Sequence, residues 1–146
     1  VTGVQTCALP IYYNGEQFVE NIEEVKGLLN NVSCELSVNE EDGKYLCVFT
    51  HNVQSPYIAT SSSPTPYGPF DEMRIAYVCP EKLCDHMYIY NAKAHPHLSK
   101  EGELLVSYNI NTSNFSENIQ YGRTYGSRFI KLRKESEAKW RKFKLS

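Results

Sequence analysis

Four polar side chains recur at every second position of one short segment. Asn91, Lys93, His95 and His97 carry amide, ammonium and imidazole groups, and residues 90–109 read as one β-hairpin whose turn is residues 100–102. In an extended strand, residues two apart project from the same face of the sheet. Such a row does not build a dry core, so we expect it to line a polar pocket.

The two imidazoles in this row allow three kinds of chemistry. His95 and His97 could bind sugar hydroxyls or tune a nearby carboxylate, they could bind a metal ion, or they could hydrogen-bond within the sheet. Tyr90, beside the row, offers a flat ring that suits either a sugar face or a core. We expect no metal ion and no other cofactor.

Strand-like runs surround this hairpin and would have to position it. Apolar and β-branched residues fill residues 33–38, 44–50, 56–61, 73–78, 104–108 and 128–132, and Asp42-Gly43 is a strong hairpin signal. Residues 62–70 hold three prolines and should be irregular. Cys34 and Cys47 fall inside these runs, so we expect both to be small core residues.

Other segments are less regular. Residues 12–31 fit a short helix or a connecting segment, and residues 113–118 read as a polar loop. Residues 134–144 fit either a basic helix with Trp140 and Phe143 on one side or a solvated segment anchored by its aromatic residues. Cys79 and Cys84 do not have a zinc-knuckle spacing, which leaves free thiols, a disulfide or a metal site open.

The strand pattern repeats once along the chain. Residues 35–37 align with residues 97–99, and residues 42–46 align with residues 101–105, so the two units lie about sixty residues apart. Repeated units of strand, turn and strand are typical of β-propeller blades, whereas a β-sandwich does not predict a repeat. We therefore expect an all-β chain with antiparallel blades at residues 32–78 and 79–132, a connecting segment at 12–31 and a basic tail at 133–146.

Composition excludes some partners. The formal net charge is −2, although seven Lys/Arg and two Glu fall within residues 131–146, so we expect neither a nucleic-acid nor a membrane partner. The absence of an apolar run long enough to cross a bilayer agrees with this. Eleven Tyr, six Phe and one Trp suit both sheets and sugar-binding surfaces.

Residues 1–11 spell, codon by codon, a common adapter of short-read sequencing libraries. We interpret them as a translated cloning artefact rather than a genuine N-terminal strand and exclude them from fold reasoning. The chain is then expected to be a metagenomic fragment whose true N-terminal part is missing.

A family resemblance rests on an ordered series of motifs. Residues 34–38, 62–70, 90–99, 105–111 and 127–130 together resemble the C-terminal part of the domain-of-unknown-function 4185 family. Its members are five-bladed β-propellers related to furanosidase-type glycoside hydrolases, and some are endo-D-arabinanases. The resemblance covers residues 32–132 and implies a C-terminal fragment of a propeller that acts on poly- or oligosaccharide.

The resemblance also implies a site. Glu35 would be the catalytic carboxylate that this fragment contributes to a central funnel; otherwise it is a partly exposed Glu that pairs with a Lys. Because glycoside hydrolysis needs two carboxyl groups, the other acid is expected in the missing N-terminal blades, and the fragment alone is expected to be inactive. Tyr90, the polar row and Arg128 would bind substrate, although Arg128 could equally form a structural bridge.

The main hypothesis is an arabinanase-like glycoside hydrolase that is active only as the full-length protein. Two other functions stay open. One is a non-catalytic carbohydrate-binding propeller, and the other is a protein-interaction propeller. Gly126 and Ser127 stand where the family would have a more constrained Arg-Pro pair, which weakens a substrate role for that loop. We expect the protein to be secreted or on the cell surface of a bacterium.

Overall fold

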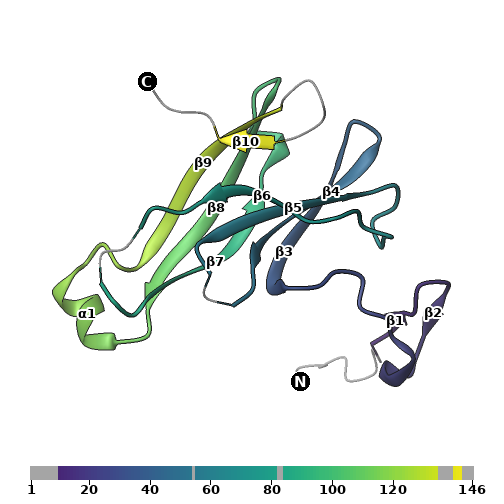
Figure 1. Ribbon diagram of the computed structural model, residues 1–146, viewed down its shortest axis with the longest axis horizontal. Coiled ribbons are helices and arrows are strands. Elements are labelled where there is room, and N and C mark those ends of the chain that lie inside the picture. Colours follow the sequence, from purple (N-terminus) through teal and green to yellow (C-terminus); the bar gives the residue numbers. More distant parts are fainter. Residues whose placement is uncertain (1–9, 54, 82–83, 135–139, 143–146) are drawn as a thin grey trace, which may run out of the picture.

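Two four-stranded antiparallel sheets make up most of the chain (Figure 1). The computed structural model describes residues 10–53, 55–81, 84–134 and 140–142. The first sheet contains β3 (Val32–Glu41), β4 (Lys44–His51), β5 (Tyr57–Ser63) and β6 (Arg74–Val78). The second contains β7 (Met87–Ala94), β8 (Glu103–Thr112), β9 (Gly126–Lys134) and β10 (Trp140–Lys142).

In both sheets, strands that follow one another in the chain are neighbours in space. The order is β3-β4-β5-β6 in the first sheet and β10-β9-β8-β7 in the second, so each sheet is a simple meander. β3 and β7, the first strand of each sheet, lie side by side. This is the arrangement of adjacent propeller blades with their inner strands together, and it agrees with the predicted all-β fold of antiparallel blades.

The predicted repeat is correct at its tight turns, residues 42–43 and residue 102. Asp42 and Gly43 join β3 to β4 with φ angles of 51° and 74°, and Gly102 before β8 also has a φ of 74°. Only glycine, and to a lesser degree Asp or Asn, adopts this backbone readily, which is why both turns are visible in the sequence. Residues 97–99, however, do not match β3, because Pro96–Leu98 forms a 3₁₀ helix, η2, instead of an inner strand.

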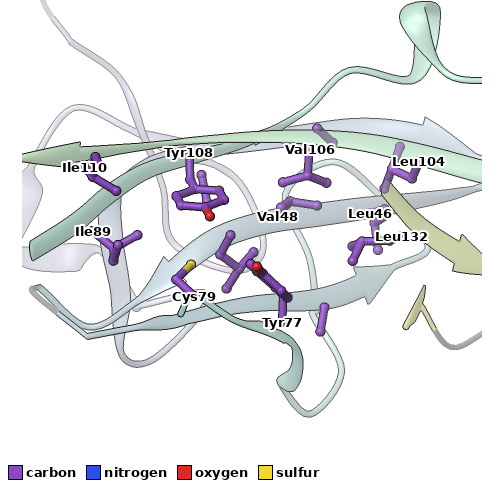
Figure 2. Close-up of a cluster of buried hydrophobic side chains, with 14 residues drawn as sticks. Leu46, Val48, Tyr77, Cys79, Ile89, Leu104, Val106, Tyr108, Ile110 and Leu132 are labelled. Carbon is purple, nitrogen blue, oxygen red and sulfur yellow. The ribbon is translucent and has the colours of Figure 1, made fainter. Parts of the chain in front are cut away.

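The main core lies between the two sheets (Figure 2). β8 alternates strictly, so that Leu104, Val106, Tyr108 and Ile110 are buried and the residues between them are not. Full burial of the aliphatic side chains among them, Leu104, Val106 and Ile110, contributes about 1.5–3 kcal/mol each. The other buried members come from both sheets and from Cys79 just after β6: Leu46, Val48, Ile58, Ala76, Tyr77, Cys79, Ile89, Ala92, Ala94 and Leu132.

Residues 12–31 form a connecting segment and not a helix of several turns. They contain the two-stranded sheet of β1 (Tyr12–Tyr13) and β2 (Phe18–Val19), which Figure 1 shows apart from the two larger sheets, and the single 3₁₀ turn η1 (Ile22–Glu24). Gly15, at a φ of 102°, is one reason that the backbone does not stay helical here. Among the described residues, no helix is long and apolar enough to cross a membrane.

A short helix replaces the polar loop expected at residues 113–118. α1 (Phe115–Gln120) begins after Asn114, whose side chain accepts a hydrogen bond from the Ser116 N–H at 3.1 Å. Such an N-cap favours a helix despite the polar composition, so the loop prediction was wrong. Of the two alternatives left open for residues 134–144, the basic helix is excluded at residues 140–142, which form β10 beside β9; residues 135–139 and 143–146 lie outside the described residues.

Glu117 ties α1 to the strands. Its carboxylate accepts hydrogen bonds from Cys84, Thr112 and His86, and the pKa of Glu117 falls to about 2 for that reason. The His86 Nδ1–Glu117 Oε1 distance is 2.8 Å. The helix is therefore held by a polar cluster, since none of its residues is buried.

The cysteines differ in exposure to solvent, and one of the two that were expected in the core lies outside it. Cys34, Cys47 and Cys84 are free thiols, and Cys79 and Cys84 are not joined to each other by a disulfide. Cys47 is buried as predicted, and burial raises its pKa to about 11. Cys34 is exposed, because it lies in the irregular part of β3 between Val32 and Leu36, and its prediction as a core residue was wrong.

Candidate functional site

The inner strands of the two blades are joined by hydrogen bonds between sheets. The Ala94 N–H of β7 donates to Ser37 Oγ of β3 at 2.8 Å, and the Ala92 N–H donates to Thr50 Oγ1 of β4 at 3.4 Å. Side-chain hydroxyls thus satisfy backbone groups that an edge strand would otherwise leave open. These bonds fix β3 against β7, and with them any site that the two strands share.

Glu35 lies on β3, in the irregular stretch between Val32 and Leu36 where the register with β4 shifts. Its side chain is half-buried. Ser33 Oγ donates to the Glu35 carbonyl oxygen at 2.9 Å, which holds the local backbone. The predicted carboxylate therefore sits on an inner strand, within electrostatic range of Tyr90 on β7.

Tyr90 is surrounded by other polar aromatic groups. Burial raises the pKa of its phenol, and the Tyr125 and Tyr88 hydroxyls and the Glu35 carboxylate raise it further, while a hydrogen bond from Asn111 opposes them. The Tyr88 and Tyr90 ring centroids are 5.5 Å apart at an interplanar angle of 41°. Tyr90 therefore remains protonated, and its hydroxyl can donate a hydrogen bond at any neutral pH.

The polar row predicted on one extended face is interrupted. Asn91 has a φ of 58° and lies where the β7–β8 register shifts between Tyr90 and Lys93. An extra residue in one strand re-aims the side chains that follow it. The strand then ends at Ala94, so His97 belongs to the 3₁₀ turn and not to a strand; the prediction of one continuous row was wrong.

The two histidines still lie near each other, by way of this turn. Their ring centroids are 6.2 Å apart in an edge-to-face arrangement. His95 is half-buried and its Nε2 lies 2.7 Å from Ser107 Oγ in the same blade, whereas His97 and Lys93 are exposed. This geometry supports a structural hydrogen bond for His95 more directly than a ligand contact.

Arg128 lies on β9, opposite Tyr108 of β8 and away from the inner strands. Its guanidinium donates to the Arg123 carbonyl at 3.1 Å and to the Ser127 carbonyl at 3.2 Å, and its Nε lies 4.0 Å from Glu81 Oε1. These contacts are those of a structural bridge, the alternative that the sequence left open.

Glu81 is a carboxylate that sequence reasoning missed. It follows β6 in the connection to the second blade, and Tyr108 Oη donates to its Oε1 at 2.6 Å. Its side chain is 16% exposed, and its Oε2 is buried without a hydrogen-bond partner in the described part of the chain. Glu81 also lines a cavity of about 340 Å³ between the blades, with Cys79 and Met87 among its neighbours. No local sequence pattern marks it, because its burial depends on tertiary packing.

No metal centre appears among the residues that the structure describes: they contain no group of three or more His, Cys, Asp or Glu side chains that could hold an ion. The polar groups that act on Tyr90 are instead the Glu35 carboxylate, the Tyr88 and Tyr125 phenols and the Asn111 amide. Such a set can bind hydroxyl groups, and with a second carboxylate it could support acid–base chemistry.

Comparison with known proteins shows which family and which solved structures the chain resembles. The model of the family described as domain of unknown function DUF5005 matches residues 10–135. No curated protein matches the chain.

The solved structures similar to it include the following two. One is a candidate hydrolase from Bacteroides ovatus ATCC 8483, with 25% identity and a TM-score of 0.58 over 67% of this chain and 26% of that one. The other is CoXyl43, a GH43 β-xylosidase/α-arabinofuranosidase from a compost microbial metagenome in complex with xylotriose, with 13% identity and a TM-score of 0.50 over 75% of this chain and 29% of that one.

These likenesses identify the two sheets as part of a five-bladed propeller like those of GH43 proteins. The chain spans between a quarter and a third of the length of the structures it matches.

Proposed function

The chain belongs to the DUF5005 family, and we propose that it forms two blades of a carbohydrate-active propeller whose full-length form is a glycoside hydrolase. Kinship with the domain-of-unknown-function 4185 family and an arabinanase-like specificity are parts of the same proposal. The carrying observation is Glu35, half-buried on an inner strand beside Tyr90 of the next blade.

Glu35 would act as one of the two carboxyl groups that glycoside hydrolysis requires. The second acid would come from the other blades of the full-length protein, so these two blades alone would be inactive. A ring of blades brings carboxylates from different strands around one sugar, and the junction of β3 and β7 is where this chain would contribute. The proposed substrate-binding residues are Tyr90, Asn91 and Lys93 of β7, His95 and His97 just after it, and Arg128 of β9.

The substrate would be a poly- or oligosaccharide. The solved structure of CoXyl43 holds xylotriose, which supports a sugar ligand for a propeller of this type but does not fix the sugar. Phenols, amides and a carboxylate are the groups that recognise several hydroxyls at once.

The test uses the full-length protein and a panel of arabinan and xylan substrates. Glu35→Gln keeps the shape of the side chain and removes its charge and its proton transfer, so we expect turnover to fall by on the order of 10²–10⁴-fold while oligosaccharide binding persists. Glu40→Gln, at an exposed position on the same strand β3, is the matched control and should leave turnover unchanged. Unchanged turnover in Glu35→Gln would remove Glu35 from the catalytic set.

A non-catalytic sugar-binding propeller is the second candidate. It is favoured by one observation: the groups acting on Tyr90 are two phenols, one amide and one carboxylate. A binding protein needs aromatic rings and amides and no second acid. Oligosaccharide binding by the full-length protein with no cleavage of any substrate would select this alternative.

A further inference from the structure

We propose that Tyr88, Tyr90 and Tyr125 form a subsite for one ring of a neutral oligosaccharide, next to Glu35. This inference rests on the proposed carbohydrate function and adds the residues that would hold the sugar. Of the three, only Tyr90 was marked by the sequence; Tyr88 and Tyr125 emerge from the fold.

Two of the three tyrosines come from β7 and the third directly precedes β9, and all three lie at one end of the second blade. Tyr88 and Tyr90 are two apart on β7, and their rings are 5.5 Å apart. Tyr125 directly precedes β9, is 67% exposed, and its phenol lies close enough to Tyr90 to act on it electrostatically. An exposed ring beside two half-buried rings offers flat carbon surface for the C–H face of a sugar, with hydroxyls at the edges.

A chain of hydrogen bonds orients the central phenol. Asn111 of β8 accepts at Oδ1 from the Thr112 N–H at 2.8 Å and from Asn118 Nδ2 of α1 at 3.0 Å. Behind it, Thr124, which is fully buried, donates from Oγ1 to Asn118 Oδ1 at 2.7 Å. With its oxygen occupied, Asn111 has only its NH₂ group to offer Tyr90.

The direction of this last bond decides what Tyr90 can do. A hydrogen bond donated by Asn111 to the phenol oxygen stabilises the phenolate, which agrees with the lowering effect of Asn111 on the pKa of Tyr90. The proton of Tyr90 is then not used by Asn111 and can be donated to a ligand. Because burial and the neighbouring phenols keep Tyr90 protonated, this donor persists across neutral and mildly alkaline pH.

The charges around the subsite favour a neutral sugar. The three phenols and the Asn111 amide are uncharged, and Glu35 is the acidic group that acts on Tyr90. A sugar hydroxyl can donate to this carboxylate and accept from the Tyr90 hydroxyl, whereas the carboxylate of a uronic acid would be repelled by Glu35. The Glu35 carboxylate therefore disfavours a uronic acid at this subsite and favours an unsubstituted pentose or hexose ring.

The experiment is calorimetric titration of the full-length protein with xylotriose and with arabinotriose, in the Glu35→Gln background so that neither is consumed. Tyr88→Ala and Tyr125→Ala should each raise the Kd for at least one trisaccharide about fivefold or more. Tyr90→Phe keeps the ring and removes one donor, so it should raise the Kd by about two- to tenfold. Tyr57→Ala, at a partly exposed tyrosine of the first blade, is the control and should change the Kd less than twofold.

The outcomes separate the subsite from the hydrolase. Tyrosine variants that bind as the Glu35→Gln parent does, with a circular dichroism spectrum like the parent's, overturn the subsite even where Glu35→Gln abolishes cleavage. Failure of the parent to bind either trisaccharide overturns it as well. Binding that the tyrosine variants weaken, in a protein whose wild type cleaves nothing, supports the subsite and refutes the hydrolase.

Discussion

Tyr108→Phe should destabilise the junction of the two blades by about 2 kcal/mol. Tyr108 is almost fully buried, and its hydroxyl donates to Glu81 Oε1 at 2.6 Å. A hydrogen bond to a charged group contributes about 1.5–3 kcal/mol, and the retained ring means that no cavity opens. Arg128 Nε, 4.0 Å from the same oxygen, would still offset part of the Glu81 charge, so we take the middle of that range.

Urea denaturation of wild type and variant measures this loss. With a slope of about 2 kcal/mol per molar urea, the unfolding midpoint should fall by about 1 M. Tyr57→Phe is the matched control, because Tyr57 is partly exposed to solvent, and its free energy of unfolding should change by less than about 0.5 kcal/mol. If Tyr108→Phe unfolds at the wild-type midpoint, the Tyr108–Glu81 bond does not hold the blades together and the reasoning fails.

Three further predictions concern packing, titration and reactivity. Leu104→Ala, at a position 1% exposed between the sheets, should lower the free energy of unfolding by about 2–5 kcal/mol in the same assay; a loss below 1 kcal/mol would contradict the core described here. The hydrogen bond and charge of Glu117 raise the pKa of His86, so the stability from this pair is present at acid pH and is lost as pH rises through that raised pKa. An NMR titration should show the His86 pKa falling in Glu117→Gln, and an unmoved value would refute the pair. In the native protein, Ellman's reagent should label the exposed Cys34 rapidly and the buried Cys47 only after unfolding; equal rates would contradict their placement.

Backbone constraints and strict alternation made parts of the fold predictable from the sequence. Asp42-Gly43 and Gly102 announce their turns, because few residues tolerate a positive φ. The alternation of buried positions along β8 could also be anticipated, because successive side chains of a strand face opposite sides of the sheet. These signals are local, and they sufficed to place two blades.

The site depended on features that local patterns do not encode. The register shift at Asn91 and the 3₁₀ turn at Pro96–Leu98 broke a row that period-two reasoning extended too far, although the proline was a visible sign of the turn. Glu81 is buried by packing between blades, and Tyr125 comes within electrostatic range of Tyr90 only because β9 returns beside β8. Such contacts join residues distant in sequence, so composition and spacing could not reveal them.

The role of Glu35 at the junction of β3 and β7 is tested most directly by a crystal structure of the full-length Glu35→Gln protein soaked with xylotriose or arabinotriose. The account predicts one sugar ring lying against Tyr90 and Tyr125, with a hydroxyl within hydrogen-bond distance of residue 35. A sugar bound at another surface, with the junction of β3 and β7 unoccupied at saturating ligand, would contradict it.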